Sequence, residues 1–211
     1  MTPGLDVLVE RAVALSLPGR AVLGVVGCPG SGKSTLAEGL VTAAGERLPG
    51  GPATVAHVPM DGFHLADVEL RRQGLLARKG APETFDAAGY AALLARLRTE
   101  EQSTVYAPAF ERDLEQPLAG AIAVGPDVRL VVTEGNYLLL DGPWAAVRSL
   151  VTEAWFVEVD DEMRVRRLVT RHEQFGKTHR EAVDWVAGVD ELNTALVRPT
   201  RQHADLVVEL D

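Results

Sequence analysis

The sequence predicts an α/β fold built on parallel strands. Five apolar runs of strand length recur along the chain, separated by helical patterns and turn residues, at positions 21–26, 53–59, 128–133, 154–159 and 204–210. The run at 128–133 is rich in valine and leucine, which is typical of a parallel strand buried on both faces. A chain of 211 residues is long enough for one such core. We therefore expect a single domain over residues 1–211.

The composition limits the classes of function. The net charge is −9, and this acidic balance argues against nucleic acid as a partner, because phosphate backbones need clustered lysine and arginine. The single cysteine allows no internal disulfide, as is typical of a reducing cytoplasm. No apolar run approaches the length of a membrane span, and the N-terminus lacks the pattern of a signal peptide. We expect a cytoplasmic protein with no membrane partner.

The first element is a helix without a chemical role. Residues 5–17 place apolar side chains at helical spacing, with Asp6, Glu10 and Arg11 between them. Pro18 and Gly19 end this pattern before the first strand. We expect the helix to pack on the edge of the sheet.

A glycine-rich loop follows the first strand, and a helical pattern follows the loop. The loop reads Gly27-Cys28-Pro29-Gly30-Ser31-Gly32-Lys33-Ser34-Thr35, which fits the G-x-x-x-x-G-K-S spacing of the Walker A motif. Glycines let the backbone curl so that successive N–H groups and the next helix N-terminus point at a polyphosphate. The pattern predicts a P-loop NTPase that binds ATP through Gly27, Pro29, Gly30, Ser31, Gly32, Lys33, Ser34 and Thr35. The alternative is a glycine-rich turn with an incidental lysine.

Three side chains are candidates for the chemistry around the phosphates. Lys33 would place its charge between the terminal phosphates, and the Ser34 hydroxyl would coordinate Mg²⁺. Glu134 ends the strand at 128–133, in the Walker B position, where a carboxylate can hold the Mg²⁺ or its water. A strand-end glutamate with only a structural role is the alternative.

The second apolar run delivers Asp61 to its carboxyl end. Ligands of open α/β sheets bind beyond the carboxyl ends of the strands, so Asp61 is our candidate general base. Because Asp-Gly is also ordinary turn chemistry, a turn or N-cap role is the alternative. His64 follows closely, and the sequence leaves it between a substrate contact and a helix cap.

Two further stretches are candidates for recognition of a phosphoryl acceptor. Residues 67–80 are polar and basic and include Arg78, and they are interpreted either as a mobile flap or as a plain connection. Residues 106–117 are predicted to be irregular, and loops of this kind often carry recognition. Their aromatic and charged side chains include Tyr106, Phe110 and Arg112. Asp86 is expected to cap the helix that follows the first stretch.

The helix after residues 154–159 carries a row of arginines. Asp160 and Asp161 would cap its start. One face is apolar, with Val165, Leu168 and Val169, and a neighbouring face holds Arg164, Arg167 and Arg171 at i, i+3 and i+7. Beside a Walker A loop we interpret this face as a lid that closes on phosphates, with Lys177 as a further candidate. A solvated basic face is the alternative. A second helix is predicted at 180–195.

Taken in order, these segments resemble the P-loop kinase family of uridine kinase, phosphoribulokinase and bacterial pantothenate kinase. The resemblance covers almost the whole chain and rests on residues 27–35, 60–64, 78–86, 106–112 and 134–140, the arginine helix and the last strand. Its nearest branch is that of the nucleoside/nucleotide kinase-like proteins named as fructose-transport kinases, which share the Asp-Gly-Phe-His and Glu-Gly-Asn-Tyr turns.

The resemblance implies a five-stranded parallel sheet flanked by helices, with the phosphate-loop strand in the middle and a helical lid. It matches Asp61 to the family's catalytic aspartate, Arg112 to an acceptor-site arginine, and Arg167 or Arg171 to the lid arginine. We assign the acceptor to His64, Arg78, Tyr106, Phe110, Arg112, Asn136 and Tyr137, and we add Arg201 to the nucleotide-binding residues. Uridine kinases carry a histidine in the loop equivalent to 108–117, and this chain has none there.

The sequence thus predicts a kinase that moves the γ-phosphoryl group of Mg·ATP to a hydroxyl of a small metabolite. A sugar, a nucleoside and a pantothenate-like molecule all remain open as acceptors, and a homodimer remains open as the assembly. The alternative is a nucleotide-binding ATPase or regulatory switch without an acceptor. The chain has no Asn-Lys-x-Asp segment to read guanine, which disfavours a GTPase.

Overall fold

Five strands form one parallel sheet in the computed structural model, which describes residues 4–210. The sheet has the order β2-β5-β1-β6-β7, and its strands are β1 (Ala21–Gly27), β2 (Val55–His57), β5 (Leu130–Gly135), β6 (Glu153–Glu158) and β7 (Leu206–Glu209). Every residue of β1 and β5 is buried, which explains the continuous apolar run of β1 and the apolar first half of β5, Leu130 to Val132. The predicted five-stranded parallel sheet, with the loop-bearing strand in the middle, is confirmed.

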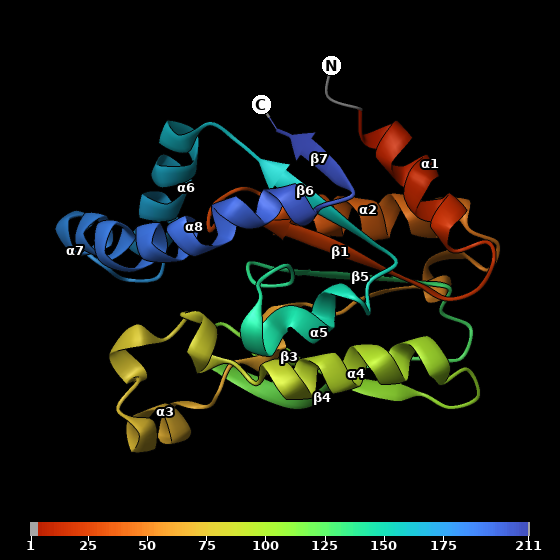
Figure 1. Ribbon diagram of the computed structural model, residues 1–211, viewed down its shortest axis with the longest axis horizontal. Helices are drawn as coiled ribbons and strands as arrows, with labels where there is room; N and C mark the ends of the chain where they lie inside the picture. The colour runs from red at the N-terminus through yellow and green to blue at the C-terminus, as the bar shows by residue number, and fades with distance from the viewer. Residues whose placement is uncertain (1–3, 211) are drawn as a thin grey trace.

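Helices cover both faces of this sheet (Figure 1). On one face, α2 (Lys33–Arg47) packs over a core that includes Leu23 and Trp155, and α1 (Leu5–Leu15) lies mainly against α2 rather than on the sheet edge. On the other face, α4 (Ala87–Thr99) and the short α5 (Ala145–Arg148) cover a core that includes Tyr90 and Phe156. The two cores hold the central strands in place, and with them the loops at their ends.

The remaining helices stand beyond the carboxyl ends of the strands, which point to the left in Figure 1. These helices are α3 (Asp67–Gln73), α6 (Asp161–Gln174), α7 (His179–Trp185) and α8 (Glu191–Val197). The helix predicted at 180–195 is present, as α7 and α8 with the π-helical turn Val186–Asp190 between them. We call residues 161–197 the lid segment. Among residues 4–210, none of the helices combines the length and the apolar character that a membrane crossing requires.

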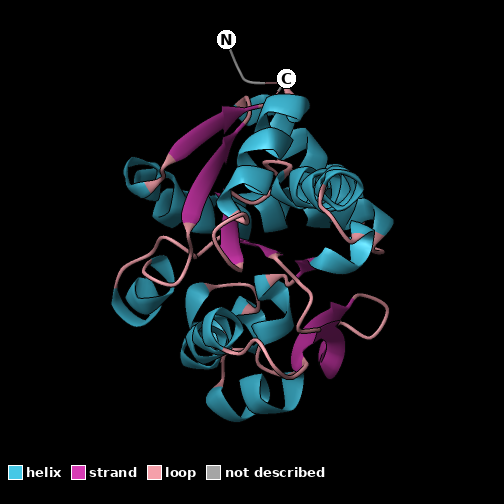
Figure 2. Ribbon diagram, turned by 90° about the vertical axis from the view of Figure 1, so that its right-hand side faces the viewer, coloured by secondary structure: helices cyan, strands magenta, loops and turns pink. Residues whose placement is uncertain are grey.

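The stretch 106–117 is not an irregular loop. It belongs to an antiparallel hairpin of β3 (Val105–Glu111) and β4 (Gln116–Val124), which Figure 2 shows apart from the parallel sheet. The prediction fails here because Pro108 and Pro117 interrupt the strand pattern of the sequence. A two-stranded ribbon tolerates proline, and the pairing register shifts between Ala107 and Ala109, around Pro108.

Two predicted helix caps are present. The Asp86 side chain accepts a hydrogen bond from the N–H of Gly89 at the start of α4. Asp160 accepts from the N–H groups of Glu162 and Met163 at the start of α6. These caps fix where the two helices begin beside the carboxyl edge of the sheet.

Candidate active site

The Walker A loop joins the carboxyl end of β1 to the start of α2. Gly30 and Gly32 adopt φ angles of 79° and 90°, which side chains with a Cβ rarely adopt, so both positions need glycine. Helix α2 begins at Lys33, and the N–H groups of its first turn have no acceptor within the helix. Ser31 is buried, and its Oγ has no hydrogen-bond partner among the described residues. The loop therefore offers unused donors in a fixed shape.

A hydroxyl and a carboxylate meet beside this loop. The Ser34 Oγ donates a hydrogen bond to Glu134 Oε1 at 3.1 Å. Glu134 pairs in register with Val25 of β1, so the strand pairing itself brings the carboxylate next to the loop. Burial raises the pKa of Glu134, Lys33 acts in the opposite direction, and Asp61 raises the pKa further. This pair of oxygen donors suits Mg²⁺, which prefers carboxylate and hydroxyl oxygens.

Asp61 faces the same space from the other side. It lies in the 3₁₀ turn Met60–Phe63 that follows β2, and its side chain is 31% exposed. Arg112, at the tip of the hairpin, places Nη2 3.6 Å from Asp61 Oδ2. The turn that carries Asp61 is in close contact with the end of β5, since a Cβ on Gly135, next to Glu134, would lie 2.5 Å from Met60 Cβ, next to Asp61.

The hairpin is docked onto the turn that carries Asp61. A Cβ on Gly62 would collide with the Pro108 carbonyl, so this close approach also needs glycine. The His64 ring lies between the rings of Phe85 and Phe110, with centroid distances of 4.0 and 4.7 Å, and burial lowers its pKa. His64 Nδ1 is also 2.8 Å from the Asp61 carbonyl oxygen. These contacts make His64 part of the joint between the turn and the hairpin.

The other acceptor candidates do not lie together: Asn136 and Tyr137 are neighbours directly after β5, whereas Arg78 and Tyr106 lie elsewhere. Tyr137 is buried and donates its hydroxyl hydrogen bond to the Gly80 carbonyl, which also accepts from Asn193 of α8. The neighbouring Asn136 leaves its buried Oδ1 without a partner among the described residues. Arg78 is paired with Glu83 at 2.6 Å, outside this group. Tyr106 is 61% exposed and alternates with buried Val105 and Ala107, so its ring faces away from the core.

The arginines of α6 do not share one role. Arg167 Nη1 lies 3.4 Å from the position of a Cβ on Gly32, which places Arg167 beside the loop, and Arg171 is exposed one turn further on. The expectation that Arg164 belongs to the free basic face is wrong, because its side chain turns inward and is buried. Lys177 lies over the Trp185 ring, and Arg201 is paired with Glu158 at 2.6 Å.

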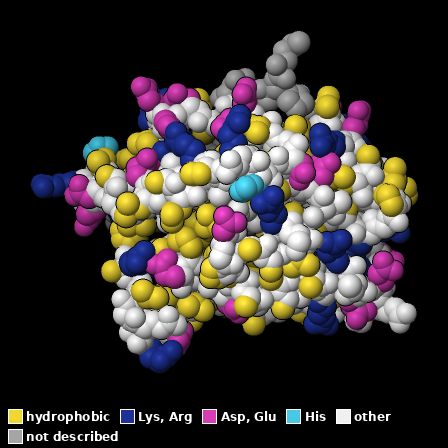
Figure 3. Space-filling model, in the orientation of Figure 1, with side chains coloured by type: hydrophobic (Ala, Val, Ile, Leu, Met, Phe, Trp, Pro, Cys, Tyr) yellow, Lys and Arg dark blue, Asp and Glu magenta, His cyan; other side chains and the backbone are white. Residues whose placement is uncertain are grey.

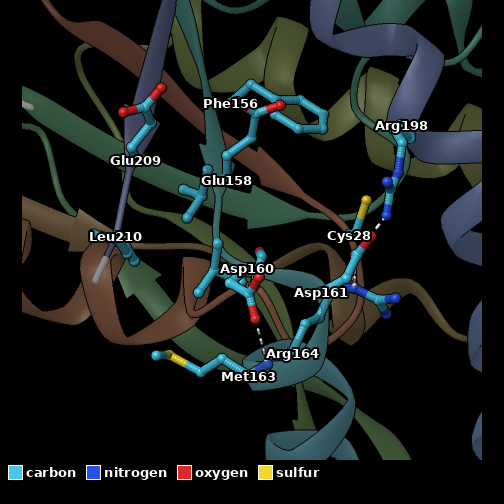
Figure 4. A pocket seen from close by; sticks show the side chains of 13 residues that line it. Cys28, Phe156, Glu158, Asp160, Asp161, Met163, Arg164, Arg198, Glu209 and Leu210 are labelled. Carbon is cyan, nitrogen blue, oxygen red and sulfur yellow. Dashed lines mark hydrogen bonds and ion pairs between the residues drawn. The ribbon is translucent and has the colours of Figure 1, made fainter.

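A cavity of about 470 Å³ adjoins the loop at the carboxyl ends of β6 and β7 (Figure 4). Cys28 and Ser31 line it on the loop side, and Met163, Glu158 and Leu210 line it on the others. Sequence analysis missed the last three residues. Their signal was available, since Glu158 ends β6, Met163 lies in the helix that follows it, and Leu210 follows β7, at the edge where open α/β sheets bind ligands. In Figure 3, apolar side chains gather where α7 and α8 face the segment that carries α3.

Comparison with known proteins adds relatives that match over most of both chains. A Schizosaccharomyces pombe protein named "Putative uridine kinase C227.14" is 34% identical over 97% of this chain and 89% of its own. The crystal structure of a "putative fructose transport system kinase" from Silicibacter sp. TM1040 has a TM-score of 0.86 and 38% identity, covering 97% of this chain and 98% of the other. YFH7 of Saccharomyces cerevisiae has a TM-score of 0.81 at 21% identity, covering 99% of both chains, which shows the shared fold. No protein-family model matches the chain.

Proposed function

Because this chain belongs to the P-loop kinase family of uridine kinase, phosphoribulokinase and pantothenate kinase, and is a small-molecule kinase, we propose that it phosphorylates a hydroxyl of a sugar, nucleoside or pantothenate-like metabolite with Mg·ATP. The kinases among its relatives support ATP-dependent phosphotransfer to a small metabolite. These relatives do not favour the alternative of a nucleotide switch without an acceptor.

The nucleotide would bind at the carboxyl edge of β1. The N–H groups of residues 30–35 would hold the β- and γ-phosphates, with the Lys33 ammonium between them. The cavity beside Cys28 and Met163 would take the nucleoside part, since it opens next to the loop. Arg201 would contribute from the end of that cavity, where it already pairs with Glu158.

Ser34 and Glu134 would hold the magnesium ion, whose charge offsets the developing charge on the phosphate oxygens when it is bound. The hydrogen bond between the two side chains supports this assignment, because it already holds two oxygen ligands side by side. Ionised Glu134 is the form that binds a cation, and the neighbouring Lys33 favours that form.

Asp61 would accept or orient the proton of the acceptor hydroxyl. Arg112 would hold a polar group of the acceptor close to Asp61, since it already approaches that carboxylate from the hairpin. Arg167 and Arg171 would neutralise charge on the phosphoryl group as it moves, and Arg167 is the better placed of the two. Most of the rate would come from positioning and electrostatics, because the phosphoryl-transfer transition state is loose.

The remaining acceptor residues would act mainly through packing. Phe110 and His64 would shape the wall beside Asp61, and Tyr137 would hold Gly80 and the flap around it. Asn136 would offer its unpaired Oδ1 to a donor of the acceptor. The positions of Arg78 and Tyr106 support only a peripheral contact, since Arg78 is paired with Glu83 and Tyr106 faces outward.

The observation that carries this proposal is the Ser34–Glu134 pair beside the phosphate loop, with the turn that carries Asp61 packed against the end of the strand that carries Glu134. The test is an ADP-release screen of the purified protein with nucleosides, free sugars, sugar phosphates and pantothenate. At least one class should raise ADP release well above the rate without acceptor. Slow hydrolysis that no acceptor stimulates would contradict the proposed kinase activity.

A further inference from the structure

Arg164 is a buried guanidinium between the phosphate loop and the lid segment. Its side chain is only 3% exposed. It donates four hydrogen bonds: to Asp161 Oδ1 at 3.1 Å, to the Pro29 carbonyl at 3.4 Å, to Thr194 Oγ1 at 3.1 Å and to Glu191 Oε1 at 2.5 Å. These acceptors belong to α6, the loop and α8. One side chain therefore ties together three segments that are far apart in the sequence.

The charge of Arg164 is balanced within the protein. Burial by itself lowers the pKa of this guanidinium, but the hydrogen bonds to Glu191 and Asp161 hold the pKa above its ordinary value. Asp161 also accepts from Arg198 at 2.6 Å, and Figure 4 shows both arginines converging on it. The group is thus a neutral cluster of two cations and two carboxylates, and it keeps Arg164 charged and in place.

The contact with Pro29 determines the orientation of a loop peptide. In a trans peptide the C=O and the following N–H point in opposite directions, and no cis peptide occurs among the described residues. Because the Pro29 carbonyl points to the Arg164 guanidinium, the N–H of Gly30 points away from that guanidinium. A Cβ on Gly30 would lie 2.8 Å from the Arg164 carbonyl oxygen and from Leu168 Cγ, so α6 touches the loop directly.

We propose that Arg164 is a positioning residue that holds the phosphate loop in its binding shape and fixes α6 and α8 against it. This inference rests on the proposed ATP-binding function. Four of the five N–H donors of a guanidinium are occupied here, so Arg164 acts through the Pro29–Gly30 peptide and not by touching phosphate. Its role differs from that of the exposed Arg167 and Arg171 on the same helix.

The test compares Mg·ATP binding in matched variants by calorimetry. The double variant Arg164→Met/Glu191→Met removes an ion pair without leaving an orphan charge, and Arg198 still pairs with Asp161, so the fold should survive. The dissociation constant of Mg·ATP should rise about tenfold, the equivalent of a lost hydrogen bond to a charged group. The control is Arg166→Met, since Arg166 is 67% exposed and reaches only Glu162. It should bind Mg·ATP as the wild type does.

The outcomes separate positioning from general stability. A merely structural Arg164 would change the melting temperature and leave the dissociation constant of the folded protein unchanged, and that result overturns the proposal. If the double variant does not fold, Mg·ATP binding is measured in Arg164→Lys instead. Lysine keeps the positive charge but cannot donate hydrogen bonds to all four acceptors of Arg164. Unchanged binding in Arg164→Lys, or an equal loss in Arg166→Met, also overturns the proposal. A wild-type protein that fails to bind Mg·ATP would instead overturn the proposed function.

Discussion

The nucleotide half and the acceptor half of the candidate active site are built by different means. The phosphate-binding part of the nucleotide half is one contiguous segment, residues 27–35, in which two positive-φ glycines set the geometry. The acceptor half combines a 3₁₀ turn, a hairpin and the turn after β5, and its charged side chains are partly exposed, as Asp61 and Arg112 show. A polyphosphate can be bound by the backbone of one segment, whereas an acceptor needs side chains from several. A short motif therefore encodes the phosphate-binding part and not the acceptor half.

The largest expected effect lies in the nucleotide half. Lys33→Ala removes the only side-chain charge that the motif places between the terminal phosphates, so turnover should fall by roughly 10⁴-fold or more and Mg·ATP should bind more weakly. The acceptor half is untouched by this change. Steady-state kinetics and calorimetry with Mg·ATP would measure the two effects, and turnover at the wild-type rate would remove the loop from the mechanism.

Asp61→Asn tests the acceptor half. Asparagine keeps the shape and one hydrogen bond but loses the charge that takes the proton, so turnover should fall by roughly 10²–10⁴-fold, the usual share of general base catalysis. The dissociation constant of Mg·ATP should barely change. A comparable loss of Mg·ATP binding would instead assign Asp61 to the metal shell, and an unimpaired variant would make it a turn residue.

The same contrast explains what the sequence could predict. The loop, the strand-end Glu134 and the parallel sheet were predictable, because each is encoded by neighbouring residues with a fixed period or spacing. The hairpin was not, since Pro108 and Pro117 hide its pattern and its close approach to Gly62 joins segments that are distant in sequence. The burial of Arg164 was also hidden, because its acceptors Pro29, Glu191 and Thr194 are distant in sequence.

Arg112→Gln should have a smaller effect, confined to binding of the acceptor. Arg112 approaches Asp61 from the hairpin and lies over the Phe175 ring of the lid segment, 6.0 Å from its centroid. Loss of one charged contact to the acceptor should raise the KM of the acceptor about tenfold. The KM of Mg·ATP should stay within about twofold of the wild-type value. A larger change in the KM of Mg·ATP than in that of the acceptor would place Arg112 in the nucleotide half.

Glu134→Gln should reveal the stability cost of the metal site. Because burial raises the pKa of Glu134 above its ordinary value of 4.5, the unfolded chain ionises first, and the stability of the nucleotide-free protein falls as pH rises from 4.5 toward the raised pKa. The glutamine variant has no such dependence and should melt higher at neutral pH, by about 2–4 °C for each kcal/mol recovered. Melting curves of both proteins that stay parallel across this pH range would contradict the argument.

The smallest effect concerns Cys28, the one thiol of the chain, which lies in the loop and lines the cavity beside it. Burial raises its pKa, against the opposing charges of Arg164, Arg198 and Lys33, so iodoacetamide should label the nucleotide-free protein slowly. Mg·ATP should slow the labelling severalfold further, because it would cover the cavity, whereas an acceptor alone should not. Mass spectrometry counts the label, and Cys28→Ser is the blank. Equal labelling with and without Mg·ATP would show that the cavity is not part of the nucleotide half.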